Sequence, residues 1–168
     1  TKIKSIFEET GLNFMWMNQN INTHTIRNQI GSILKDQFRQ KWHQDVQMSR
    51  KGRHYYTYKK DTDFENYLLL TPRNLSHYIF KFRTANHRFP IEVGRWHNIP
   101  YENRFCDKCN LNTIGDETHY LLKCQFFNNN RETFIDTKYT HTHNQFAFAN
   151  LLKSQDIAEL AKLGKFLR

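Results

Sequence analysis

The chain has 168 residues, of which 38% are hydrophobic and 15% aromatic, and this is enough for one packed domain or two small ones. No run of about 18 apolar residues occurs, and the start lacks the residue order of a secretory signal. We therefore expect an intracellular protein, nuclear or cytoplasmic, without a membrane partner. Because the first residue is Thr1 and not Met, we also expect a fragment or processed product.

The charge of the chain is strongly positive, with 25 Lys and Arg against 16 Asp and Glu and a formal net charge of +9. Such an excess favours a polyanionic partner, RNA or DNA. The stretch from Arg50 to Lys60 contains no acid and interleaves its cations with tyrosines, which suits phosphate contacts and base stacking. The predicted nucleic-acid contacts are Arg50, Lys51, Arg53, Lys59, Lys60, Arg83, Arg88 and Arg95. The alternative is that the cations are merely solvated and that the tyrosines and Trp96 belong to the core.

Hydrophobic spacing predicts a mainly α-helical fold. A short helix over 2–9 should stop at Gly11, and an amphipathic helix should cover 25–48, where apolar residues recur every three or four positions. Its stripe consists of Ile26, Ile30, Ile33, Leu34, Phe38, Trp42 and Val46. The one strand candidate, 55–58, is too short to define a sheet.

Further helices are predicted in the second half of the chain. A short helix is expected over 61–70, and Thr71 should cap a new helix with Pro72 in its first position. Residues 89–100, with two prolines at their ends and a glycine, indicate an ordered connector, and 137–144 a polar loop. Helical spacing then returns over 146–152 and 157–167, with Ser154 as a plausible cap.

All three cysteines of the chain lie close together in a metal-ligand pattern: Cys106, Cys109, His119 and Cys124. A Cys-x2-Cys turn places two thiolates beside one metal, and four sulfur or nitrogen ligands are typical of a closed structural zinc site. The odd cysteine count disfavours a disulfide framework, so the remaining alternative is free thiols beside a surface histidine. Asp116 should cap a helix whose first turn carries His119, and that helix should bend or end before Cys124.

No Walker loop, nucleophile elbow or HExxH sequence occurs, so we expect no catalysis by this chain alone. Glu132, Asp136 and Lys138 form only a weak nuclease-like trio, because such chemistry needs carboxylates fixed on a sheet.

The region from about Ile26 to Ile135 resembles the carboxy-terminal region of non-LTR retrotransposon reverse transcriptases. The residues that carry this resemblance are Lys81, Phe82, Arg83, Asn86, His87, Arg88, Ile91, Glu92, Gly94, Arg95, the two cysteines of the turn, Gly115, Asp116, Glu117 and His119. The resemblance implies a post-thumb zinc-knuckle (CCHC) region that holds template RNA or target DNA during target-primed reverse transcription. The polymerase palm would then lie outside these residues, in the remainder of a polyprotein.

The sequence thus predicts a small helical domain with an inserted CCHC zinc knuckle, divided into residues 1–60, 61–135 and 136–168. Its predicted role is binding of RNA or DNA. The rival hypotheses are a protein-interaction module of a domesticated, element-derived protein and, less favoured, an independent enzyme.

Overall fold

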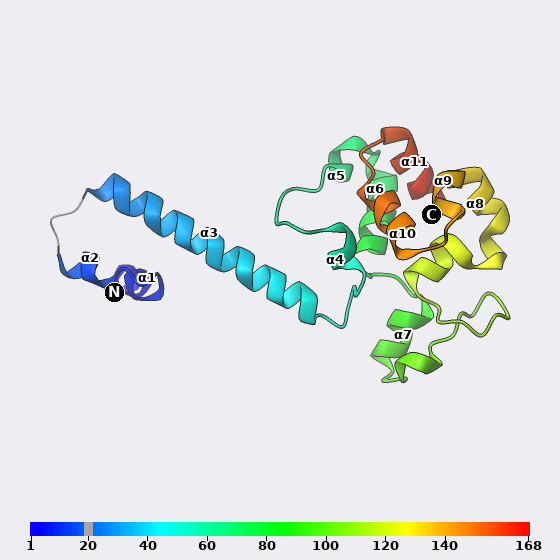
Figure 1. Cartoon of the computed structure of the whole chain (residues 1–168), viewed down its shortest axis with the longest axis horizontal. Helices are drawn as coiled ribbons and strands as arrows, with labels where there is room; N and C mark the ends of the chain where they lie inside the picture. Colours follow the sequence, from blue (N-terminus) through cyan, green and yellow to red (C-terminus); the bar gives the residue numbers. More distant parts are fainter. Residues whose placement is uncertain (19–21) are drawn as a thin grey trace. The chain divides into compact units, whose positions relative to one another are not determined.

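The computed structural model describes residues 1–18 and 22–168, and it is mainly α-helical, as the hydrophobic spacing predicts (Figure 1). Within these residues, extended pairing is limited to an isolated antiparallel bridge between Phe105 and Ile114. No helix of the described part is both long and apolar enough to cross a bilayer. The chain divides into two compact units, Thr1–Met48 and Ser49–Arg168.

The described residues of the first unit form three helices: α1 (Lys2–Glu9), α2 (Asn13–Met17) and α3 (Thr23–Met48). Helix α1 ends as predicted, because Gly11 takes the left-handed backbone conformation that glycine tolerates, with φ of +71°. The turn brings the ring of Phe7 to 5.7 Å from that of Trp16, between centroids. Two short helices are thereby joined by an aromatic contact.

Helix α3 is confirmed, and it begins two residues earlier than predicted. The side chain of Asn22 supplies the cap, since its Oδ1 accepts hydrogen bonds from the amides of His24 at 2.9 Å and Thr25 at 3.3 Å. The apolar stripe is present but not packed: no residue of α3 is buried, and Phe38 is 61% exposed.

The second unit carries the remaining helices. In chain order they are α4 (Tyr55–Tyr58), α5 (Tyr67–Leu70), α6 (Arg73–Arg83), α7 (Pro90–Trp96), the 3-10 turn η1 (Tyr101–Asn103), the π-helical turn η2 (His119–Lys123), the 3-10 turn η3 (Gln125–Phe127), α8 (Asn128–Phe134), α9 (Thr137–Thr140), α10 (Gln145–Lys153) and α11 (Ile157–Phe166).

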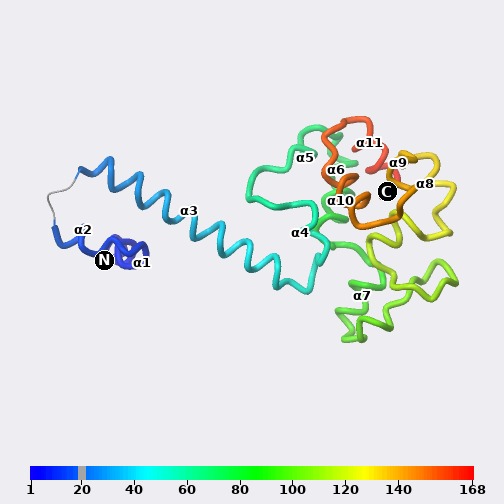
Figure 2. Tube along the Cα trace, in the orientation of Figure 1, coloured from blue at the N-terminus to red at the C-terminus, as the bar shows by residue number. Residues whose placement is uncertain are grey.

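The C-terminal helix α11 closes the core of this unit by packing on α5, α6 and α8, as the trace of Figure 2 allows the reader to follow. Helices α6 and α11 approach closely because Gly164 has no side chain: a Cβ there would lie 2.7 Å from Cβ of Leu75. Helix α10 packs on α4 and α9 and contributes Phe148, which is 1% exposed. Leu121 and Leu122 of η2 belong to the same core, so the segment of the predicted metal ligands is anchored in it.

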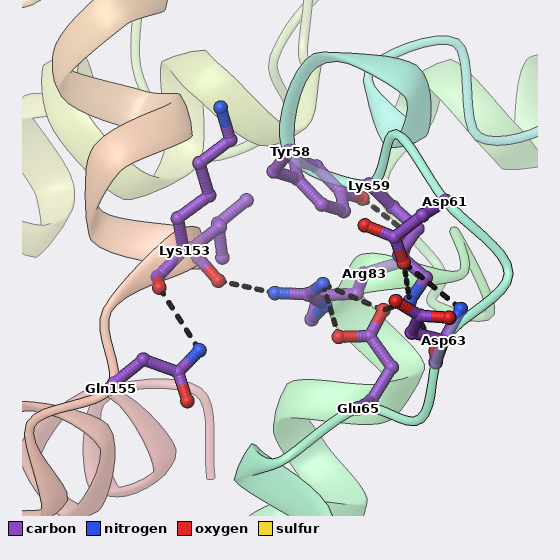
Figure 3. Close-up of polar contacts among 9 residues, drawn as sticks. Tyr58, Lys59, Asp61, Asp63, Glu65, Arg83, Lys153 and Gln155 are labelled. Atoms are coloured by element: carbon purple, nitrogen blue, oxygen red, sulfur yellow. Dashed lines mark hydrogen bonds and ion pairs between the residues drawn. The ribbon is translucent and has the colours of Figure 1, made fainter.

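A buried arginine links three segments of this unit (Figure 3). The guanidinium of Arg83 donates from Nη2 to both carboxylate oxygens of Glu65, at 2.9 and 2.8 Å, and from Nη1 to the carbonyl of Leu152. It also lies over the rings of Tyr58 and Tyr67, at 4.7 and 4.8 Å from their centroids. A charge that is 4% exposed is thus neutralised and hydrogen-bonded, as a buried ion must be.

Local structure departs from prediction at several helix ends. Thr71 does not cap α6: its hydroxyl donates to the carbonyl of Tyr67 at 2.7 Å, and Pro72 occupies the cap position. Similarly, Asp156 and not Ser154 caps α11, by accepting the amide of Glu159 at 2.9 Å. The start of α6 therefore has no side-chain cap, whereas α11 is capped by the residue two positions after the predicted one.

Four short segments also differ from expectation. The strand candidate 55–58 is helical, and of 61–70 only Tyr67–Leu70 forms a helix. The connector 89–100 contains helix α7, which begins at Pro90, and the polar loop 137–144 begins with helix α9. Each of these helices has seven residues or fewer, too short for a periodic signal in the sequence.

Candidate metal centre and basic surface

The four predicted ligands meet in one cluster. One ligand atom from each of Cys106, Cys109, His119 and Cys124 lies within 4.8 Å of all the others. Sγ of Cys106 is 3.8 Å from Sγ of Cys124, and Sγ of Cys109 is 3.4 Å from Nε2 of His119. With zinc bonds of about 2.3 Å to sulfur and about 2.0 Å to nitrogen, a tetrahedral site has edges of about 3.8 and 3.5 Å. These two edges of the cluster therefore have the lengths expected of a tetrahedral metal centre.

The Cys-x2-Cys turn sits at the end of a short ribbon between Arg104 and Gly115. The amide of Cys106 donates to the carbonyl of Thr113 at 2.8 Å, and the amide of Gly115 to that of Arg104 at 2.8 Å. The amide of Lys108 points back to Sγ of Cys106 at 3.4 Å. Glycine is needed at 115 because a Cβ would lie 3.0 Å from Cα of Cys106.

His119 and Cys124 are brought together by a π-helical turn. Asp116 caps this segment as predicted, its Oδ1 accepting the amide of His119 at 2.8 Å. On a regular α-helix the two ligands would be about 140° apart. Instead, the amide of Cys124 bonds to the carbonyl of His119 at 2.7 Å, and this five-residue ring brings Cys124 back over His119. The helix ends at Lys123, directly before Cys124, so its predicted ending is confirmed, whereas the π-turn was not predicted.

Two side chains beside the cluster, Thr113 and Tyr120, have fixed partners. Oγ1 of Thr113 lies 3.2 Å from Nδ1 of His119, so Nδ1–H can donate to it and leave the Nε2 lone pair for a metal. The hydroxyl of Tyr120 donates to Asp107. The ring of Tyr120 stacks on that of Phe89, with centroids 4.1 Å apart and planes 12° apart. Both ends of Tyr120 are therefore fixed beside the Cys-x2-Cys turn.

The ligands differ in their readiness to bind a metal ion, because the pKa is lowered at His119 and Cys106 and raised at Cys124. Burial lowers the pKa of His119, which keeps its imidazole neutral at pH 7. At Cys106 burial acts to raise the pKa, but hydrogen bonds from the backbone amides of Lys108 and Cys109 outweigh it and lower the pKa. Burial, with Cys106 as neighbour, raises the pKa of Cys124 to about 12. A divalent cation would supply the charge that allows this buried thiol to ionise.

Two of the eight residues predicted to contact nucleic acid, Arg83 and Lys59, are buried. Arg83 is bound by Glu65 in the core, as described above. Lys59 is 8% exposed, and its Nζ lies 2.9 Å from Oδ1 of Asp61 and donates to the carbonyl of Asp63 (Figure 3). The expectation that these two cations contact phosphates is corrected, because a buried cation with its own partners cannot reach a strand at the surface.

The other six cations remain accessible. Arg50, Lys51 and Arg88 are exposed, as are Arg53, whose guanidinium lies 4.3 Å from the centroid of Tyr101, and Lys60, 3.6 Å from that of Tyr56. Arg95 is half-buried and bonds to Glu92 at 2.9 and 2.8 Å.

The aromatic residues of the basic region divide between core and surface. Tyr58 is buried, Tyr55 and Tyr56 are half-buried, and Trp96 is 49% exposed. Tyr58 therefore belongs to the core, as the alternative hypothesis states, whereas Trp96 is exposed. Arg104 was not among the predicted contacts, although it lies two residues before Cys106 and lines one pocket with Arg50, Arg53 and Arg95.

Comparison of the chain with protein-family models, with curated proteins and with solved structures finds no match. What the fold and the site define is a mainly helical protein with a Cys3His cluster that can hold a metal ion.

Proposed function

We propose that this chain is the nucleic-acid-binding, zinc-stabilised accessory region of a non-LTR retrotransposon reverse-transcriptase-like protein, which holds template RNA or target DNA during target-primed reverse transcription. The observation that carries the proposal is that the metal cluster and the accessible cations belong to one compact unit, residues 49–168. The resemblance of the sequence to this class of reverse transcriptases supports the same assignment.

Zinc is the metal that this donor set favours. Three thiolates and one imidazole, with two edges of tetrahedral length, suit zinc, and soft sulfur ligands disfavour magnesium and calcium. Four protein ligands leave no open position for water or substrate, so the metal would be structural. Its role would be to tie the Cys-x2-Cys turn to η2 and thereby to the core.

The accessible cations would provide affinity by neutralising phosphates. Arg50, Lys51, Arg53 and Lys60 come from the acid-free stretch, and Arg88 and Arg95 flank or lie within α7. Contacts of this kind hold the backbone without reading bases, so binding to RNA and DNA should be broad. On this proposal the chain performs no chemistry by itself, and the polymerase palm belongs to another part of the protein.

Salt-dependent binding tests the proposal. Affinity for single-stranded RNA and for DNA should fall steeply with salt, and replacing Arg50, Lys51, Arg53 and Lys60 by Glu should weaken binding to both and flatten this dependence, by about one unit of slope for each lost contact. The charge-matched control replaces Arg73, Lys153, Lys162 and Lys165, which are exposed on other helices, by Glu.

The two variants also decide between hypotheses. If both variants lose the same affinity for RNA and DNA, binding depends on the net charge of the chain and not on the position of the four cations. If the first variant keeps the affinity and the salt slope of the parent chain, the protein-interaction hypothesis moves ahead.

A further inference from the structure

One pocket of the second unit is lined by four arginines, and none of its described lining residues is acidic. It has a volume of about 520 Å³. The polar side chains that matter are Arg50, Arg53, Arg95, Arg104 and Tyr101. They come from the loop before α4, from α7 and from the segment of η1, so the pocket exists only in the folded unit.

One of these arginines, Arg104, is fixed by backbone carbonyls. Arg104 donates from Nε to the carbonyl of Ile99 and from Nη1 to that of Ile91, each at 2.9 Å. Gly94 makes room for it, because a Cβ there would lie 2.6 Å from Cγ of Arg104. Arg104 therefore presents its remaining N–H groups from a fixed position.

The other arginines differ in how firmly they are held. The guanidinium of Arg53 lies over the ring of Tyr101, and Arg95 is oriented by its two bonds to Glu92, whose side chain is 3% exposed. Arg50 is exposed. The pocket thus combines preorganised guanidinium groups with one that is free to close on a ligand.

The positive charge of the pocket favours an anionic ligand. Four guanidinium groups opposed by the single carboxylate of Glu92 leave an excess of three positive charges around one cavity, and like charges repel strongly where water is partly excluded. Guanidinium forks match the oxygens of phosphate in a bidentate manner, better than lysine ammonium groups do. Phosphate is therefore the ligand group that this pocket fits.

We propose that this arginine pocket binds a phosphate group of an RNA or DNA strand. The inference rests on the proposed function and goes further by assigning the affinity to one site in place of a diffuse basic surface. The phosphate can be a diester within the strand or the monoester at a 5′ end, which carries about −1.5 to −2 charges at neutral pH.

The test compares two double variants of the full chain with equal loss of charge. R50Q/R53Q removes two pocket arginines, whereas K51Q/K60Q removes two exposed lysines of the same stretch that do not line the pocket. Binding of labelled oligouridine is measured by fluorescence anisotropy at about 0.1 M salt, where charges beyond about 10 Å are screened. We expect R50Q/R53Q to lose about 10-fold or more in affinity, and K51Q/K60Q no more than about 3-fold.

A third variant, R50K/R53K, keeps the charge and removes the guanidinium forks, and it should also bind more weakly than the parent chain. Oligouridine with a 5′-phosphate or a 5′-hydroxyl distinguishes the two phosphate sources. A preference for the 5′-phosphate that disappears in R50Q/R53Q identifies the strand end, and equal binding of both identifies an internal diester.

Equal losses in R50Q/R53Q and K51Q/K60Q would overturn the pocket while leaving the proposed function intact. A parent chain that binds neither RNA nor DNA would overturn both.

Discussion

Oγ1 of Thr113 lies 3.2 Å from Nδ1 of His119, so a hydroxyl from the ribbon between Arg104 and Gly115 orients the one imidazole of the Cys3His cluster. Outer partners of this kind fix the tautomer of a ligating histidine, and their loss costs about 10- to 100-fold in metal affinity. We expect Thr113→Val to weaken zinc binding in this range, as measured by competition with a chromogenic chelator. Thr133→Val, which removes an exposed hydroxyl bonded only to the Asn129 carbonyl, is the control and should leave the affinity unchanged.

Removal of the metal should unfold the region around the cluster. We expect about one zinc per purified chain, and treatment with a chelator should lower the melting temperature and the helical circular dichroism signal, since metal binding and folding are coupled in such sites. Cys109→Ser should reproduce the effect, and added zinc should restore the chelated parent but not the variant. Substoichiometric metal in carefully purified protein would contradict the zinc assignment.

Gly115 tests how tightly the Cys-x2-Cys turn is packed. A Cβ at this position would lie 3.0 Å from both Cα of Cys106 and Cγ of Pro90, so Gly115→Ala should destabilise the second unit by about 2 kcal/mol and reduce its zinc content. The control is Gly31→Ala within α3, where nothing lies within 4 Å of the new methyl group. That substitution should be neutral or stabilising by up to about 1 kcal/mol. Similar melting profiles for the two variants would argue against the close packing.

Arg83 and Arg50 should respond in opposite ways to the same substitution. Arg83→Gln removes the bidentate partner of Glu65, which keeps only Lys59 at 3.9 Å, and should cost about 3 kcal/mol in the free energy of unfolding. Arg50→Gln should change it by less than about 0.5 kcal/mol. Only Arg50→Gln should weaken RNA binding by protein that remains folded. Denaturant unfolding and anisotropy on the same samples check both halves of the prediction. If the Arg83→Gln variant is as stable as the parent chain but binds RNA more weakly, Arg83 contacts RNA and the prediction is wrong.

Glu159 should give the stability of the second unit a dependence on acid pH. Burial acts to raise its pKa, but hydrogen bonds from Lys138, Ser154 and Tyr139 outweigh it and lower the pKa below its usual 4.5. The folded state thus binds this proton less readily than the unfolded state. The stabilisation is complete above pH 4.5 and is lost as the pH falls through the lower folded pKa.

Comparison of the parent chain with Glu159→Gln checks this sign. The variant should be less stable by about 1 kcal/mol at pH 7, and the difference should shrink below the usual pKa of the carboxyl. Glu132→Gln, at an exposed position, should show no such trend. A difference that stays constant with pH would mean that the carboxylate charge contributes nothing.

The sequence by itself determined the features that depend on local spacing. The ligand set Cys106, Cys109, His119 and Cys124 follows from the clustering of the cysteines, and the cap at Asp116 and the long helix α3 follow from patterns a few residues long. Such features need only short-range geometry, because capping bonds and helical periodicity involve neighbours along the chain.

Only the tertiary structure decided which cations are available. Arg83 and Arg50 are chemically identical, yet Arg83 is buried by Glu65 and the Leu152 carbonyl, which lie far from it in sequence. The arginine pocket likewise depends on segments around residues 50, 95 and 104 that meet only in the folded unit. The π-turn between His119 and Cys124 also depends on tertiary structure, since Leu121 and Leu122 belong to a core built by distant helices. Which arginine is buried, and which arginines meet in one pocket, depends on contacts between residues far apart in the sequence. Periodicity along the chain does not reveal such contacts.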